Sequence, residues 1–341
     1  MCRSELRSDC VERPLVSIVI PAYNAEQHID ECLYSISNQS YEKIEVVVVD
    51  DGSKDKTADL CLLWEKRDSR FSVIRQANQG VSAARNKGLR ESSGEWVLFV
   101  DADDQLEAEA IEKTIKASSG ADVVIYGIAI VDGGGATMEK VLPPRCESMS
   151  SLALSQEIAK GNFQEFSPCY LFKRSLLDAP ISNDGPYETG ISLFEDALVI
   201  QKVLRTNDLT IKCLPEVLYL YRQTDSSASH RCNPGVARSG LKAISMLEAI
   251  GSPIGCEAEW RAKLVMMLVE TVDRVAGPGI WDGQSALHHE INQKVRGIAS
   301  SGALRFPSCE KRLKYALFRL HLYRLIRRLY TNLKRFSRSR A

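Results

Sequence analysis

Short apolar runs alternate with amphipathic segments over the first 126 residues. The runs at 16–20, 45–49, 72–75, 96–100 and 122–126 are rich in β-branched residues and are predicted to be strands. Apolar residues recur at helical spacing in 25–38, in a segment that begins near Ser53 or Asp55, in 81–89 and in 107–117. In the second of these helices, Leu60, Leu63 and Trp64 are expected to face inward.

This alternation predicts an α/β fold, Rossmann-like, with a mostly parallel sheet that carries helices on both faces. In such open sheets, ligands bind beyond the carboxyl ends of the strands. Polar residues follow the first, second and fourth predicted strands, so we expect them to gather at one edge of the sheet.

The pattern loses its regularity after Gly127. Three glycines at 133–135 and two prolines at 143–144 indicate loops, and a boundary is expected within 128–150. Residues 150–230 mix helical and strand-like pieces, and a helical region is predicted over about 235–300.

Composition narrows the class of protein. The 341 residues are 44% hydrophobic and carry a formal net charge of +0, which predicts a globular protein and gives no reason to expect nucleic acid as a partner. The ten cysteines are scattered without zinc-site spacing, as expected in a reducing compartment. We find no signal peptide and no apolar run long enough to span a membrane, so a cytoplasmic location is expected.

The acidic segment Asp101-Ala102-Asp103-Asp104 at the end of the fourth strand is the sharpest chemical signal. Carboxylates packed at a strand end repel one another, and a hard divalent cation such as Mg²⁺ or Mn²⁺ would compensate them. The alternative is a turn followed by a helix cap, where Asp is equally favoured.

Three further segments carry candidate residues. Asp50 and Asp51 end the second strand, although Asp-Gly turns are also common there. Arg85 follows Asn78 in Asn-Gln-Gly-Val-Ser-Ala-Ala-Arg-Asn and could hold a phosphate, or simply lie on a solvated helix face. Glu195-Asp196 opens a helix, where acidic residues are routine partners of the helix dipole.

Other chemistries lack their motifs. No phosphate-binding glycine loop, zinc-type histidine cluster or Gly-x-Ser-x-Gly elbow is present. A nucleotidyltransferase would typically have a glycine-rich loop after the first strand, where this chain has Pro-Ala-Tyr-Asn. A glycosidase would need two carboxylates flanking a sugar and no nucleotide pocket.

Four segments together resemble the inverting glycosyltransferases of family 2, which have the GT-A fold. They are Val16-Ser-Ile-Val-Ile-Pro-Ala-Tyr-Asn24, Val48-Val-Asp-Asp-Gly-Ser53, the segment 78–86 and Phe99-Val-Asp-Ala-Asp-Asp104. A looser likeness continues through Tyr170-Leu-Phe-Lys-Arg174, Phe194-Glu-Asp196 and the segment 214–222. Many relatives have Asn-Lys where this chain has Cys169-Tyr170, so its acceptor contacts can differ.

The resemblance implies roles for these residues. The nucleotide pocket would be formed by Pro21, Ala22, Tyr23, Asn24, Asp50, Asp51, Asn78 and Arg85, with Asp50 or Asp51 contacting a uracil ring. Asp101 and Ala102 would contact the ribose or metal side, and Asp103, with Asp101, would bind Mn²⁺ or Mg²⁺. Asp196, with Glu195 beside it, would be the catalytic base.

The implied function is metal-assisted transfer of a sugar, with inversion, from a nucleotide-diphosphate donor to a glycan or lipid-linked acceptor of surface polysaccharide synthesis. The donor expected from the resemblance is a UDP-sugar. The implied organisation is a catalytic domain over 14–230, with a nucleotide-binding half (14–127) and an acceptor-side half (128–230), then a helical extension over 231–303. The alternative is a catalytically silent protein that binds a sugar nucleotide or acts as a scaffold at the membrane.

The last segment, 304–341, is basic. From Lys311 to Arg340 there are eleven Lys or Arg residues and no Asp or Glu, with apolar residues interleaved. Such a helix can lie on an anionic membrane, here the inner face of the cell membrane. It can equally pack its apolar face on the domain; RNA binding has no recognisable motif to support it.

Overall fold

The computed structural model describes residues 13–178, 184–206, 208–223, 234–275 and 286–319. All five predicted strands are present and belong to one ten-stranded sheet. The strands are β1 (Val16–Ala22), β2 (Ile44–Asp50), β3 (Phe71–Arg75), β4 (Trp96–Phe99), β5 (Gln105–Leu106), β6 (Val123–Val131), β7 (Thr137–Val141), β8 (Ser148–Ser150), β9 (Tyr170–Lys173) and β10 (Thr210–Arg222).

The strand order is β3-β2-β1-β4-β9-β6-β10-β5, with β7 paired to β6 and β8 to β10. Neighbours from β3 to β4 are parallel, as predicted. β9 is antiparallel to both β4 and β6, so β6 runs in the same direction as β4, and β10 is parallel to β6. The carboxyl ends of β1, β2, β4, β6 and β10 therefore meet at one edge of the sheet.

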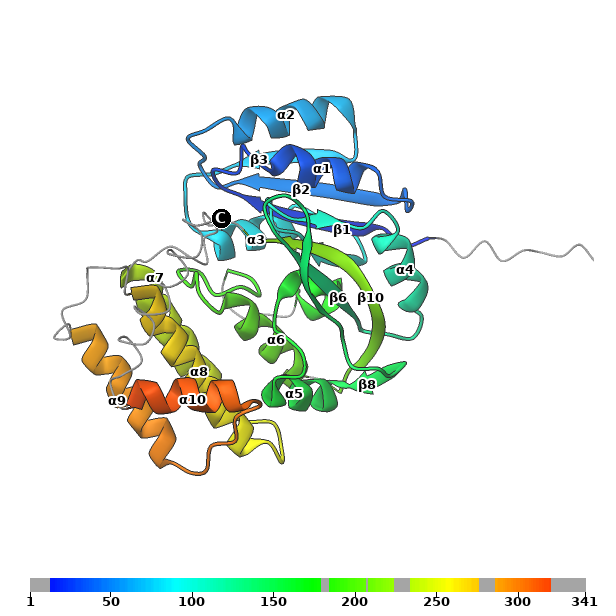
Figure 1. The fold of residues 1–341 in the computed structure, drawn as a ribbon. Helices are drawn as coiled ribbons and strands as arrows, with labels where there is room; N and C mark the ends of the chain where they lie inside the picture. Colours follow the sequence, from blue (N-terminus) through cyan, green and yellow to red (C-terminus); the bar gives the residue numbers. More distant parts are fainter. Residues whose placement is uncertain (1–12, 179–183, 207, 224–233, 276–285, 320–341) are drawn as a thin grey trace, which may run out of the picture.

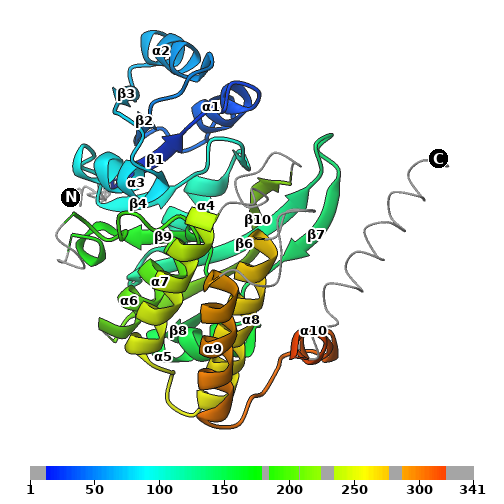
Figure 2. The ribbon, with the colours of Figure 1, turned by 90° about the vertical axis from the view of Figure 1, so that its left-hand side faces the viewer.

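Helices cover both faces, which confirms the predicted fold class. Figure 1 shows α2 above strands β1–β3 and α3 below them, and Figure 2 shows α1 and α3 on opposite sides of β1. The helices are α1 (Ile29–Ser37), α2 (Thr57–Arg67), α3 (Val81–Arg90), α4 (Ala110–Ala117), α5 (Ser151–Lys160), α6 (Glu195–Thr206), α7 (Pro234–Ile250), α8 (Glu257–Val275), α9 (Ala286–Ser300) and α10 (Cys309–Arg319), with 3-10 turns at Ser167–Cys169 and Arg174–Leu176.

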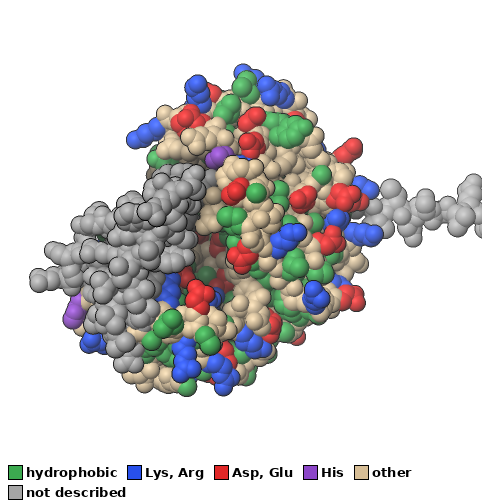
Figure 3. Space-filling model, in the orientation of Figure 1, with side chains coloured by type: hydrophobic (Ala, Val, Ile, Leu, Met, Phe, Trp, Pro, Cys, Tyr) green, Lys and Arg blue, Asp and Glu red, His purple; other side chains and the backbone are tan. Residues whose placement is uncertain are grey.

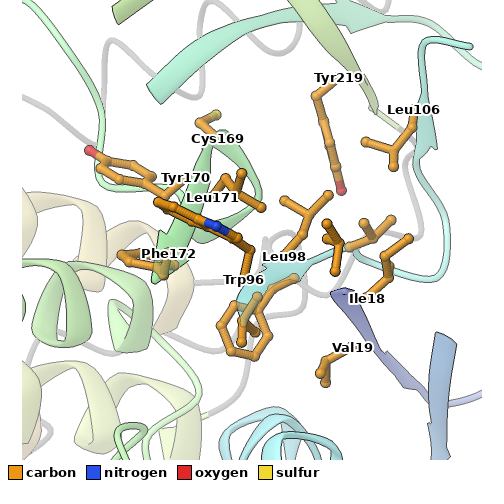
Figure 4. Close-up of a cluster of buried hydrophobic side chains, with 14 of the residues drawn as sticks. Ile18, Val19, Trp96, Leu98, Leu106, Cys169, Tyr170, Leu171, Phe172 and Tyr219 are labelled. Atoms are coloured by element: carbon orange, nitrogen blue, oxygen red, sulfur yellow. The ribbon is translucent and has the colours of Figure 1, made fainter. Parts of the chain in front are cut away.

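The main core joins the two predicted halves. Its buried residues run from β1 to β10, and Figure 4 shows Ile18, Trp96, Phe172 and Tyr219 converging from four strands. The inward prediction for Leu63 is wrong: this side chain is exposed, because α2 turns Cys61 toward the core instead.

A second core lies among the C-terminal helices. In Figure 2, α7, α8 and α9 lie side by side below the strands, with α6 next to α7. Ala197 and Leu198 of α6 share this core with Leu241 of α7 and Trp260 of α8. The proposed domain boundaries remain predictions. Within the described ranges, no helix is long and apolar enough to cross a membrane.

Candidate functional site

The loops that follow β1 and β2 hold each other. The Asn24 backbone N–H donates to Ser53 Oγ at 3.0 Å, and Asn24 Oδ1 accepts from the Lys54 backbone N–H at 2.9 Å. Asn24 has φ 50, a left-handed conformation that Asn tolerates better than most residues. This turn leaves Tyr23, beyond the half-buried Pro21, with 38% of its surface exposed at the sheet edge, where a flat ligand ring could stack.

Asp51 organises the loop that leads into α3. Its carboxylate accepts hydrogen bonds from the backbone N–H groups of Gln79 and Gly80, each at 2.8 Å, and its own N–H donates to the Ala22 carbonyl at 2.8 Å. The side chain is 3% exposed. Asp51 therefore fixes the wall of the predicted nucleotide pocket, and its contact with a uracil ring remains a prediction.

Asp50 lies one residue earlier and is fully buried. It forms an ion pair with Arg75 at 3.1 Å at the end of the neighbouring strand β3. Gly52 has φ 75, and a Cβ there would lie 2.9 Å from the backbone nitrogen of Asn78, so glycine is required for the two loops to approach. Asn78 itself is exposed and available to a ligand.

Asp104 is structural. It is 1% exposed, and its carboxylate accepts from the Tyr219 hydroxyl at 2.6 Å and from the Arg222 backbone N–H at 2.7 Å. Burial, together with Asp103 and Asp101, raises the pKa of Asp104 well above its ordinary value. The third acidic residue thus fastens the end of β10 to the end of β4.

Asp103 and Asp101, the two residues that the sequence suggests as metal ligands, both follow β4. Burial and then the charge of Asp101 raise the pKa of Asp103 to about 6. The Asp103 side chain accepts no hydrogen bond from another described residue, and Ala102 between the two is buried. Figure 3 shows a hollow beside the undescribed residues, with acidic side chains among those at its rim. Crowded carboxylates of this kind are stabilised by a cation.

These two carboxylates fit a divalent ion that also binds phosphate. Among the described residues, no group of three or more His, Cys, Asp or Glu could hold a metal ion by itself. Mg²⁺ is commonly bound through one or two carboxylates, with phosphate and water oxygens completing its shell. The carboxylate oxygens of Asp101 and Asp103 would therefore suit an ion that is shared with a diphosphate, rather than one held by protein ligands alone.

Arg85 connects the two sides of the site. Its guanidinium is buried and lies 2.8 Å from Asp101 Oδ1, 3.2 Å from Glu195 Oε1 and 3.0 Å from Asp196 Oδ1. It also lies over the Tyr187 ring, 5.2 Å from the centroid. Burial disfavours its charge, but Asp196 and Asp101 raise the pKa of Arg85 well above its usual value. One permanent cation thus stands among three carboxylates.

At the first turn of α6, Asp196 is buried and Glu195 is half-buried. Burial and the neighbouring Asp196 raise the pKa of Glu195 to about 7, against the opposing effect of Arg85. Burial also raises the pKa of Asp196, whose carboxylate accepts from Ser167 Oγ at 2.8 Å. The residue before them, Phe194, has φ 66, which for a bulky side chain costs about 1–3 kcal/mol. Such strain concentrates at functional sites.

The structure thus brings Arg85, Asp101, Glu195 and Asp196 into one cluster. Asp50, Asp51 and Asn78 lie at the neighbouring loops instead, so the contacts of Arg85 favour a positioning role over contact with a nucleotide. Sequence reasoning missed four residues that support the cluster. They are Ser167, Tyr187, Tyr219 and Arg222. Tyr219 and Arg222 lie in the segment 214–222, whose looser family likeness could have pointed to them. No motif or periodicity in the sequence marks Ser167 or Tyr187.

Comparison with known proteins points to one family. Residues 17–179 match the family described as Glycosyl transferase family 2. EpsH of Bacillus subtilis is 34% identical over 171 residues, which are 50% of each chain. The GalNAc(5)-diNAcBac-PP-undecaprenol beta-1,3-glucosyltransferase of Campylobacter jejuni is 28% identical over 56% of this chain and 64% of its own. The chain thus spans between half and two thirds of these relatives' length.

Solved structures show the same fold. S. aureus TarS 1-349 in complex with UDP-GlcNAc has a TM-score of 0.60 at 20% identity, covering 83% of this chain and 81% of that one. The mannosyltransferase PcManGT from Pyrobaculum calidifontis, in complex with GDP-Man and Mn²⁺, has a TM-score of 0.54 at 17% identity, covering 94% and 88%. These likenesses establish the GT-A fold.

Proposed function

Because the chain belongs to glycosyl transferase family 2, we propose that it transfers a sugar from a UDP-sugar to a hydroxyl group of a glycan or lipid-linked acceptor, with inversion. The observation that carries this proposal is the Arg85 cluster. Arg85 holds Asp101, at the end of β4, together with Asp196, at the start of α6. One side chain thus joins Asp101, a candidate residue of the donor site, to Asp196, the candidate base, although the two are ninety-five residues apart in sequence.

In the proposed reaction, Asp196 accepts the proton of the acceptor hydroxyl as its oxygen attacks the anomeric carbon. The attack comes from the face opposite the leaving diphosphate, so a single displacement inverts the configuration. Ser167 and Arg85 fix the Asp196 carboxylate, and fixed geometry lowers the entropic part of the barrier. Tyr23 and the loop held by Asp51 would bind the uridine, with Asn78 exposed beside them.

Asp103 and Asp101 would hold Mn²⁺ or Mg²⁺ together with the donor. Bound there, the ion would offset the negative charge of the diphosphate that departs. Burial and the charge of Asp101 raise the pKa of Asp103, and a cation bound there would favour its ionised form.

The relatives support the choice of substrates. The structure of TarS was solved with UDP-GlcNAc, and the C. jejuni relative is named after an undecaprenol-linked glycan. A relative named for teichuronic acid biosynthesis, TuaG of B. subtilis, is 38% identical over 105 residues. We therefore place the proposed reaction in the synthesis of a surface polysaccharide.

Metal-dependent UDP binding tests the donor site. Calorimetry should show that Mn²⁺ tightens UDP binding to the wild type by at least about tenfold, or 1.4 kcal/mol. Asp103→Asn should lose this gain, because its amide cannot supply the negative charge that holds the ion. Asp59→Asn, on the exposed side of α2, is the matched control and should bind like the wild type. Absence of UDP binding under both conditions would remove the proposed donor.

Transfer itself is tested by release of UDP from a panel of UDP-sugars with lipid-linked and glycan acceptors. Donor-dependent release supports the proposal. UDP binding without release from any donor would favour the catalytically silent alternative instead.

We also propose that the basic segment 304–341 attaches the protein to the inner membrane surface. The described helix of this segment, α10, packs Tyr315 and Phe318 into the second core. This helix therefore packs its apolar face on the domain. Leu313 is 58% exposed on the same helix. The remaining residues, 320–341, lie outside the described ranges and supply seven of the eleven cationic residues from Lys311 onward.

Vesicle sedimentation tests this attachment. The full chain should sediment with vesicles that contain about 30% anionic lipid and should be released by high salt, because the attraction is electrostatic. A chain that ends at Arg319 should remain in the supernatant, as should the full chain with zwitterionic vesicles. Equal sedimentation of both chains would contradict the proposal.

A further inference from the structure

The turn before Glu195 and Asp196 is held between two helices. On one side, Ser82 of α3 donates from its hydroxyl to the Ile191 carbonyl at 2.7 Å, and Asn86 bonds the backbone of Tyr187 in both directions, at 2.7 and 3.0 Å. α3 also carries Arg85. The nucleotide side of the molecule therefore fixes one flank of this turn.

The other flank is fixed by α7, outside the segment that matches the family. The Ser192 backbone N–H donates to Ser239 Oγ at 3.3 Å, and the two hydroxyls lie 3.3 Å apart. At the next position, Gly240, an added Cβ would lie 2.8 Å from Leu193 Cδ2 and 3.3 Å from Thr271 Oγ1. Leu193 can approach α7 this closely only because residue 240 has no side chain.

The contact between α7 and the 191–194 turn affects the proposed base, Asp196, because only two residues separate Leu193 from it in sequence. Leu193 is followed by Phe194 in its left-handed conformation, and Phe194 packs against the second core. Glu195 begins α6 directly after it. Leu193 Cδ2 is the end of a flexible side chain and can give way in part, but Leu193 is buried, so the rest of the displacement is expected to reach Phe194 and the first turn of α6.

We propose that Ser239 and Gly240 are positioning residues: through the 191–194 turn, the C-terminal helices set where Asp196 lies relative to Arg85 and the donor. This inference rests on the proposed function, in which Asp196 is the base. It assigns the helical extension a part in catalysis, since through the 191–194 turn the extension would determine the geometry of the acceptor side.

Gly240→Ala is the sharpest test. Alanine favours a helix over glycine by about 1 kcal/mol, which offsets the cost of displacing Leu193, so the thermal unfolding midpoint should stay close to that of the wild type. The new methyl group should nevertheless push Leu193 away, and kcat should fall at least about tenfold while UDP affinity stays within about twofold. Ala249→Val, on the exposed side of the same helix, should match the wild type.

Two further variants separate positioning from general damage. Adding Leu193→Ala to Gly240→Ala makes room for the methyl group and should recover much of the lost kcat. Ser239→Ala removes the hydrogen bonds of this hydroxyl to Ser192 and to the Val236 carbonyl without adding bulk, and should lower kcat about threefold or more. Wild-type kcat in both Gly240→Ala and Ser239→Ala would overturn the proposal.

Amide hydrogen exchange gives a readout that needs no substrate. Peptides covering 187–198 should exchange faster in Gly240→Ala than in the wild type, whereas peptides from β1 and β2 should not change. Unchanged exchange at 187–198 would overturn the positioning role even if transfer were never observed. Lack of UDP release by the wild type, with faster exchange in the variant, would instead count against the proposed function alone.

Discussion

Replacing Asp196 by Asn should lower kcat by about a thousandfold, because a positioned general base contributes roughly 10²–10⁴ in rate. The amide has nearly the same shape and can still accept from Ser167 and Arg85, so the fold should be kept. It cannot take up the acceptor proton. UDP affinity should stay within about twofold, since the proposed uridine contacts come from the loops after β1 and β2. Steady-state kinetics and calorimetry on the same preparation check both expectations.

Glu195→Gln is the matched control, because it alters the neighbouring carboxylate on the same cation. Glu195 contacts Arg85 but not Ser167 and should tolerate the change with a loss of about tenfold or less. The pKa of Glu195, about 7, would also suit a base near neutral pH. A larger loss in Glu195→Gln than in Asp196→Asn would therefore exchange the two roles.

The first half of the fold was predictable from local pattern. The β-branched runs that became β1, β2, β4 and β6 each follow a turn signal and are buried on both faces, so hydrophobicity alone locates them. β9 lies within 150–230, where the pattern mixes helical and strand-like pieces and locates no single strand. Four residues long and antiparallel to both neighbours, it owes its place to pairing with strands far away in sequence. Local propensity carries no record of such partners.

The candidate site likewise contains some residues that the sequence predicts and others that it does not. Asp50, Asp51, Asp101 and Asp103 could be anticipated because each stands at a strand end, and parallel strands bring their ends together. That Asp104 differs from its neighbours could not be anticipated, since its role depends on Tyr219 donating from β10. Likewise, Ser167 reaches Asp196 from an irregular segment that no periodicity identifies.

Arg85 was the residue whose surroundings differed most from expectation. An arginine early in a helix is by default solvated, and the family likeness placed it in the nucleotide pocket. Its side chain is instead 3% exposed and paired with three carboxylates from two distant segments. A buried cation with three acidic partners makes the halves of the site depend on each other, which gives the second large prediction.

Replacing Arg85 by Met should destabilise the protein by about 3–5 kcal/mol at neutral pH, because it leaves buried carboxylates without a compensating charge. Arg90→Met, at the exposed end of the same helix, should cost less than about 1 kcal/mol. Urea unfolding of the two variants measures the difference. Adding Asp196→Asn to Arg85→Met should recover part of the loss, since it removes one of the uncompensated charges.

The loss should also depend on pH in a defined direction. Arg85 lowers the pKa values of Glu195 and Asp196, so these values should rise further in Arg85→Met. A carboxyl group whose pKa is higher in the folded state than in the unfolded state stabilises the fold below its unfolded pKa, and this contribution disappears as pH rises through the folded pKa. The variant should therefore lose stability steadily from about pH 4 to above pH 7, and its deficit relative to the wild type should be smaller at pH 5 than at pH 8. A deficit that stayed constant over this range would mean that burial of the aliphatic part of Arg85, and not its charge, holds the two sides of the site together.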